Sequence, residues 1–124
     1  MPVTSKQRAE EQDFGVAIDR TAHLDDITVN IVTIRETHSL KDALAALPGG
    51  TCQCPHWGYM LAGHMSCDYG DRTESYGPGD AFYMTPGHVP TADAGAEFVI
   101  FSPKDQLAAT DAAIKSAMLA RQPG

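Results

Sequence analysis

Short runs of β-branched and apolar residues, separated by turn residues, dominate the hydrophobic pattern of this chain. The clearest run, Ile-Thr-Val-Asn-Ile-Val-Thr-Ile at 27–34, predicts a strand. A shorter strand is expected at 14–18, and residues 19–26 are expected to form a loop. Turn residues punctuate the chain from residue 51 onward, and strands are predicted there over 52–62, 65–69, 73–76, 81–84 and 97–101. Many short strands at regular intervals are typical of an all-β sandwich or small barrel.

Two stretches have helical patterning. Ser39 is a suitable cap for a short helix that Pro48-Gly49-Gly50 would end, and the apolar stripe of this helix is Leu40, Leu44 and Leu47. The sequence Ser102-Pro103-Lys104-Asp105 is typical of a helix start. It predicts a C-terminal helix over about 103–120, with an apolar stripe of Leu107, Ile114 and Met118. This helix is expected to pack on the outside of the barrel or to cover a dimer partner.

The length of 124 residues fits one domain with a single core. Residues 1–12 are polar and are expected to form a flexible N-terminal arm. Residues 13–124 are expected to form the single domain, with the barrel core at about 51–103.

Charge and composition exclude several partners. The formal net charge of −7 argues against nucleic acid and anionic membranes, because phosphate binding needs clustered Lys and Arg. No apolar run approaches the ~20 residues of a membrane span, and the amino terminus is too polar for a signal peptide, so a cytoplasmic location is expected. Three cysteines is an odd count, and two cysteines two apart on a strand are poorly placed for a bridge, so reduced thiols are expected.

Three metal-ligating side chains alternate in the chain at Cys52, Cys54 and His56. Alternate side chains of an extended strand share a face, so these three are predicted to converge. The alternative is that both cysteines are small apolar residues of the barrel wall.

The region from Cys52 to Pro103 resembles the cupin superfamily of small jelly-roll barrels. Two half-motifs carry the resemblance: the run ending in Gly58-Tyr59-Met60-Leu61-Ala62-Gly63, and Gly79-Asp80 followed after five residues by Pro86-Gly87-His88-Val89-Pro90. The resemblance implies an all-β, cupin-type jelly-roll barrel, here with a short N-terminal helix and a C-terminal helix. It also implies a homodimer, for which the apolar stripe of the C-terminal helix is a second indication.

The chain departs from the usual cupin ligands, which are a His-x-His pair, a Glu and a later His. His56 stands where the Glu is expected and Cys52 where the second His is expected, whereas Gly50 replaces the first His. Pro90 stands at the last His position, but His88 precedes it by two residues and would share its face. A reshuffled metal set is therefore predicted: Cys52, Cys54, His56 and His88.

Two thiolates and two imidazoles favour Zn²⁺, with Fe²⁺ second. Four protein ligands would make a structural site, and three with an open position a catalytic one. Three histidines outside the set, His23, His38 and His64, are interpreted as surface residues, and Cys67 as a core residue.

Apolar and aromatic side chains near these ligands could line a pocket for a small molecule: Trp57, Tyr59, Phe82, Tyr83 and Met84. The alternative is that they are plain core.

Three functions remain open. The first is a metal-dependent enzyme on a small organic molecule, with isomerase or lyase chemistry for zinc and dioxygenase chemistry for iron. The second is a non-catalytic module that binds a small ligand or a metal, and the third is a dimerising scaffold. The fold does not decide among them.

Overall fold

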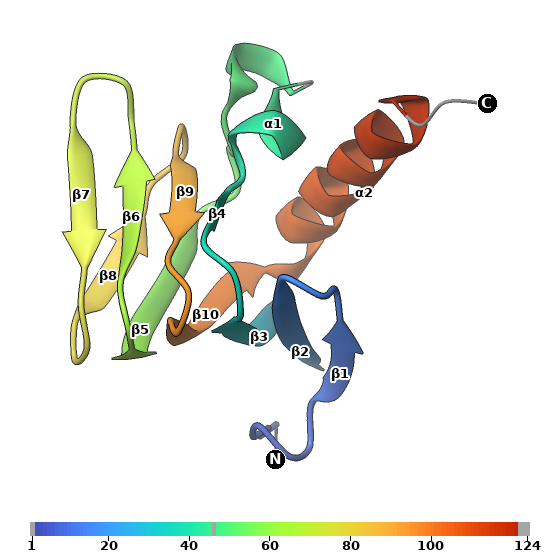
Figure 1. The fold of residues 1–124 in the computed structure, drawn as a ribbon. Coiled ribbons are helices and arrows are strands. Elements are labelled where there is room, and N and C mark those ends of the chain that lie inside the picture. Colours follow the sequence, from blue (N-terminus) through green and yellow to red (C-terminus); the bar gives the residue numbers. More distant parts are fainter. Residues whose placement is uncertain (1, 46, 122–124) are drawn as a thin grey trace.

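The computed structural model describes residues 2–45 and 47–121, and in these residues two antiparallel sheets face each other (Figure 1). The larger sheet has the order β1-β2-β3-β10-β5-β8, formed by Glu10–Asp13, Ala17–Leu24, Ile27–Ile34, Glu97–Pro103, His56–Ala62 and Ala81–Met84. The smaller sheet has the order β4-β9-β6-β7, formed by His38–Ser39, Val89–Ala92, Met65–Asp68 and Thr73–Tyr76. This all-β, two-sheet architecture is the predicted jelly roll.

Every second side chain of the facing strands points into the space between the two sheets. Met60, Phe82 and Phe98 point inward from the larger sheet and meet Met65 and Tyr76 of the smaller one in a single buried cluster. Gly58 lies mid-strand because a Cβ there would come within 2.4 Å of the Phe82 ring. The strand pattern thus produces one compact apolar core between the sheets.

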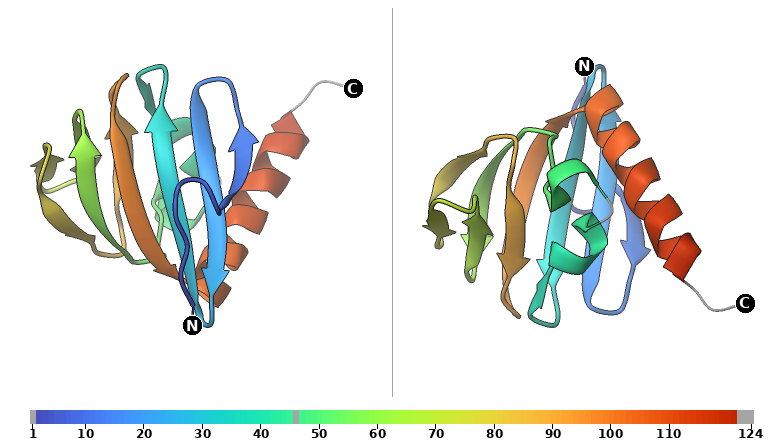
Figure 2. Two further views of the ribbon diagram at one scale, coloured as in Figure 1. Left: turned by 90° about the horizontal axis from the view of Figure 1, so that it is seen from below. Right: turned by 90° about the horizontal axis from the view of Figure 1, so that it is seen from above.

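The helices lie together beside this core. Helix α1 (Lys41–Leu44) is followed by a 3₁₀ turn at Pro48–Gly50, and helix α2 (Lys104–Arg121) continues from β10 (Figure 2). Leu44 of α1 is fully buried with Cys52 and Cys54, and Leu107 of α2 packs against the same cluster. Helix α2 therefore covers the inner side of the larger sheet, and the expectation that it packs on the outside of the barrel is wrong.

Several strand boundaries differ from the sequence prediction. The strand at 27–34 is confirmed as β3, and those at 73–76 and 81–84 as β7 and β8. The predicted loop at 19–26 is wrong, because β2 continues to Leu24 and pairs with β3. Strand β5 begins only at His56, so the predicted strand over 52–62 is shorter. The side chains of Ile114 and Met118, which were to complete the apolar stripe of α2, lie outside the described side chains.

Strand β1 and the N-terminal segment extend the larger sheet. Glu10–Asp13, at the end of the predicted arm, pairs with β2. The ammonium of Lys6 lies 3.0 Å from the Glu97 carboxylate on β10. No helix in the described part of the chain has the length and apolar character that crossing a membrane requires.

The outer face of the larger sheet carries an apolar patch. The outward-facing, exposed residues of β3, β5, β8 and β10 that form it, called the outer patch below, are Ile27, Trp57, Tyr59, Leu61, Tyr83 and Phe101. The Trp57 and Tyr83 rings stack at 5.0 Å between centroids. A contiguous exposed apolar surface of this kind is typical of an interaction site.

Candidate metal centre

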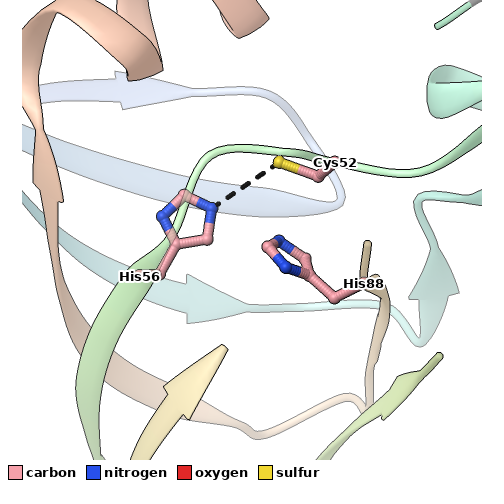
Figure 3. A group of neighbouring side chains, drawn as sticks. All are labelled: Cys52, His56 and His88. Atoms are coloured by element: carbon pink, nitrogen blue, oxygen red, sulfur yellow. Dashed lines mark hydrogen bonds between the residues drawn. The ribbon is translucent and has the colours of Figure 1, made fainter. Parts of the chain in front are cut away.

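Cys52 from the segment before β5, His56 at the start of β5 and His88 from the turn before β9 come together in the fold (Figure 3). A backbone bridge joins two of them: the Cys52 amide donates to the His88 carbonyl at 3.0 Å, and the Gly87 amide donates to the Cys52 carbonyl at 2.8 Å. His56 is the first residue of β5 and pairs with Met84 of β8. One ligand atom from each of the three lies within 4.8 Å of the others, which is close enough for one metal ion.

Each histidine of this group has its second ring nitrogen held by a neighbour. His56 Nδ1 is hydrogen-bonded to Ser102 Oγ at 2.6 Å. His88 Nδ1 donates to the Thr85 carbonyl at 2.7 Å, so its Nε2 carries a free lone pair. His56 Nε2 lies 3.8 Å from Cys52 Sγ. A hydrogen bond to the ring nitrogen that does not bind the metal is typical of metal-ligating histidines, because it selects the tautomer and fixes the ring orientation.

The interior keeps both imidazoles neutral. Burial lowers the pKa of His56 to about 4, with the neighbouring His88 adding to the shift. Burial also lowers the pKa of His88, although its bond to Thr85 acts in the opposite direction. Two neutral imidazoles at neutral pH are competent metal ligands.

The thiol of Cys52 needs a cation to ionise. Burial raises its pKa above the ordinary thiol value, so without a neighbouring positive charge the thiolate is disfavoured. A divalent cation supplies that charge directly. The donor set therefore fits a metal ion chemically, as a buried sulfur with two buried nitrogens.

Cys54 is the one predicted ligand that lies outside this group. The chain bends between Cys52 and β5, and the Cys54 thiol lies 3.6 Å from the Pro55 carbonyl and packs with Leu44. Burial, followed by the Cys52 charge, raises its pKa to about 12. The alternation of Cys52, Cys54 and His56 does not bring all three together, because a bend interrupts the strand.

The remaining histidines and the third cysteine have other partners. His64 lies 3.0 Å from Asp93 on the surface, and His38 lies 2.8 Å from the Glu36 carbonyl. His23 is hydrogen-bonded to Thr28 at the exposed end of β2. Cys67 is fully buried in the main core.

The five side chains predicted to line a pocket are divided between two faces. Phe82 and Met84 point into the core, whereas Trp57, Tyr59 and Tyr83 belong to the outer patch. The five do not form one lining, because neighbouring residues of a strand point to opposite sides. Phe82 and Met84 alone remain beside the metal group.

Sequence reasoning missed the contacts of Ser102 and Thr85. The sequence predicts Ser102 only as part of a helix start, yet it lies fully buried on the inner face of β10, beside His56. Alternation within the strand 97–103 places Ser102 on the inward-facing side, and this is the one feature of the sequence that indicates its position.

Comparisons with known proteins support the fold. No protein-family model matches the chain, and no curated protein matches it. A protein of unknown function from Rhizobium leguminosarum has a TM-score of 0.61 at 21% identity, covering 82% of this chain and 95% of that chain. The polyketide cyclase RemF from Streptomyces resistomycificus has a TM-score of 0.60 at 17% identity, covering 84% and 80%. An RmlC-like cupin from Shewanella frigidimarina has a TM-score of 0.56 at 13% identity, covering 81% and 88%.

The structural neighbours further include a cupin-2 domain protein and an oxalate decarboxylase from Bacillus subtilis. This chain has the cupin jelly-roll fold.

Proposed function

We propose that this chain is a metal-dependent enzyme that acts on a small organic molecule. Cys52, His56 and His88 hold the metal, which is Zn²⁺ in preference to Fe²⁺. The observation that carries the proposal is the convergence of three buried ligand atoms within 4.8 Å, with the other nitrogen of each imidazole already engaged.

The donor set favours zinc. One thiolate and two imidazoles are ligands that zinc accepts in tetrahedral sites, and neutral histidines require no proton release on binding. Iron remains second, because imidazole also suits Fe²⁺. Zinc would direct the enzyme to isomerase or lyase chemistry, and iron to dioxygenase chemistry.

Three protein ligands make the catalytic form of such a site. A cation held by Cys52, His56 and His88 alone would keep an open position, and there it would supply Lewis-acid chemistry toward a carbonyl oxygen or water. Ser102 holds His56 and the Thr85 carbonyl holds His88, so both imidazoles keep their orientation. Burial of all three side chains excludes bulk water, which strengthens electrostatic interactions at the centre.

Two structural neighbours are enzymes by their names, a polyketide cyclase and an oxalate decarboxylase. The alternative is a non-catalytic module that binds a ligand or metal, and the fold accommodates both. A free coordination position decides between them.

The test begins with elemental analysis of the chain purified without chelator or a metal-binding tag. About one zinc per chain is expected for a single three-ligand site. Cobalt is then substituted for zinc, and azide is added while the visible spectrum is recorded. A spectral change shows an open position and supports the enzyme, an unchanged spectrum favours the binding module, and a metal-free protein contradicts the proposal.

The proposal extends to assembly and location. The outer patch contains no charged side chain, so two copies of an acidic chain can meet there without like-charge repulsion. We therefore propose a homodimer through the outer patch. Three unbridged cysteines, one of them a metal ligand, suit the reducing cytoplasm.

A further inference from the structure

A row of four polar side chains crosses the inner face of the larger sheet, from the surface to the metal group. Strands β2, β3, β10 and β5 are neighbours in that order, and their register aligns His23 with Thr28 and Thr28 with Ser102. Ser102 in turn contacts His56 at the start of β5. These four residues, called the polar row below, connect an exposed histidine to a proposed metal ligand.

The neighbouring row of the same face lacks this continuity. Its members are Thr21, Asn30, Ile100 and Gly58. An isoleucine and a glycine carry no hydrogen-bonding side chain, so no line of polar groups runs through that row. The polar row is therefore a feature of its own four positions and not of the sheet in general.

Hydrogen bonds occupy both ends of the polar row. His23 Nδ1 lies 3.0 Å from Thr28 Oγ1, and His56 Nδ1 lies 2.6 Å from Ser102 Oγ. Thr28 and Ser102 are only 2% and 0% exposed, so their hydroxyls have no access to bulk water. In the described structure each hydroxyl is bonded to its own histidine, and the two are not bonded to each other. Directly opposite residues have Cβ atoms about 5 Å apart, and Ser and Thr hydroxyls in such positions can hydrogen-bond.

Metal binding through His56 Nε2 would fix the direction of every hydrogen bond in the row. His56 Nδ1 then carries the ring proton and donates to Ser102 Oγ, so the Ser102 hydroxyl can no longer donate to that nitrogen. A buried donor needs another acceptor, and Thr28 Oγ1 is the side-chain acceptor directly opposite. Thr28 then donates to His23 Nδ1, and the proton of neutral His23 resides on Nε2.

Protonation of His23 imposes the opposite direction. An imidazole that carries both ring protons can only donate, so Nδ1 would donate to Thr28, and Thr28 to Ser102. Ser102 would then donate to His56 Nδ1, and the proton of neutral His56 would reside on Nε2, the atom that is to bind the metal. A metal ion at His56 and an added proton on His23 therefore oppose each other, and this coupling is reciprocal.

His23 lies where a proton can reach it. The residue is exposed, and histidine is the side chain that ordinarily gains a proton in mild acid. Its ring is hydrogen-bonded to Thr28 alone among the described residues. The charged residues of its own strand, of the following turn and of the adjoining β1 and α2 are Asp19, Asp25, Asp26, Glu10, Lys104, Asp105 and Asp111. None of these is altered in the variants below, so a comparison of the variants isolates the polar row.

We propose that His23 is a positioning residue of the metal centre, which selects the metal-binding tautomer of His56 through the hydroxyls of Thr28 and Ser102. This inference rests on the proposed function, because it concerns the same centre. It makes the affinity for zinc respond to a proton that is taken up at the surface, three strands away from the ligand.

The test measures the zinc affinity of the full chain by chelator competition at pH 7.5 and 5.5. The parent chain should lose about fivefold more affinity over this interval than His23→Gln, whose side chain cannot take up a proton. His64→Gln, the same change at another exposed histidine, should behave as the parent. Thr28→Val should weaken zinc binding about tenfold at pH 7.5, because Ser102 loses its acceptor. Thr28→Ser keeps the hydroxyl and should bind zinc as the parent does.

Nitrogen NMR of the imidazole rings reports the tautomers directly. Zinc should convert His23 to the form protonated on Nε2 and leave His64 unchanged. Equal pH dependence in the parent and His23→Gln, or unchanged zinc affinity in Thr28→Val, would overturn the inference. If Thr28→Val fails to fold, His23→Gln carries the test from the surface. A chain that binds no zinc contradicts the proposed function as well, whereas zinc binding without an effect of His23 contradicts only this inference.

Discussion

Ser102 Oγ lies 2.6 Å from His56 Nδ1, and both side chains are buried, on strands that are adjacent in the sheet but 46 positions apart in the chain. The contact couples the sheet register to the metal centre. If β10 slipped by one residue against β5, Ser102 would turn outward and the imidazole would lose its partner.

Ser102→Ala should therefore weaken zinc binding by about ten- to hundredfold, the usual effect of removing a hydrogen-bond partner of a ligand. It should also lower the free energy of unfolding by about 1–3 kcal/mol, because His56 Nδ1 stays buried without a partner. Chelator competition and urea denaturation measure the two effects. Ser75→Ala, on the exposed face of β7, is the control and should change neither.

Cys52→Ser should abolish zinc binding, whereas Cys54→Ser should retain about one zinc per chain. Only Cys52 Sγ belongs to the three-ligand group, and the Cys54 thiol lies among Leu44 and its neighbours. Elemental analysis of the two variants is the measurement. Loss of zinc from both would restore a four-ligand, structural site.

His88→Ala should lose zinc, and His64→Ala should not. His88 is buried in the group, while His64 lies on the surface beside Asp93. Zinc also stabilises the folded state by binding it selectively, so only His88→Ala should remove the rise in melting temperature that zinc produces. Equal behaviour of the two variants would refute the placement of His88.

Acid should destabilise the metal-free protein between pH 6.5 and about 4. The pKa of His56 is about 4 in the folded chain against 6.5 in the unfolded one, so the unfolded state binds more protons in this window. Stability is then complete above pH 6.5 and is lost as the pH falls, by on the order of 2 kcal/mol at pH 5 for this residue.

Urea denaturation of the metal-free protein at pH 7.5 and 5 measures this loss. The raised pKa of Asp19 acts in the opposite direction, since the folded state then binds the extra proton. The comparison is therefore made against His56→Gln, in which the loss should be smaller. An equal loss in the variant would assign the acid sensitivity to other groups.

Phe101→Lys should convert a dimer into a monomer without loss of zinc. Phe101 is 41% exposed within the outer patch, and a lysine there would place like charges opposite each other in a two-fold interface. Phe14→Lys, at a site between β1 and β2 that is 57% exposed and outside the outer patch, is the control and should stay dimeric. Sedimentation velocity measures the oligomeric state of both variants and of the parent chain. A monomeric parent chain would contradict the proposed dimer.

The short strands and turns of the second half predicted an all-β sandwich or small barrel, and the resemblance to cupins implied the jelly roll. The prediction failed at β2, where Asp19 and Thr21 face the interior and Arg20 is buried on the outer face. A strand with a polar inner face does not show the alternation that strand prediction relies on. The polar residues that misled the prediction are Asp19 and Thr21 on the inner face and Arg20 on the outer face.

The sequence predicted the metal group only in part. Cys52 and His56 converge with His88 as expected, but through a backbone bridge instead of one continuous strand. Local spacing could not reveal the bend that turns Cys54 away, nor the pairing of β10 with β5 that brings Ser102 to His56. These contacts are set by tertiary register, which short-range pattern does not contain.

The bridge between Cys52 and His88 also determines what the metal must do during folding. Bringing two such distant segments together costs roughly 3 kcal/mol of loop-closure entropy. Here the sheet and the two bridging backbone bonds close the loop, so the metal does not have to. A zinc finger folds only around its ion, whereas this chain should remain folded when its metal ion is removed. Its metal can then be exchanged without unfolding the protein.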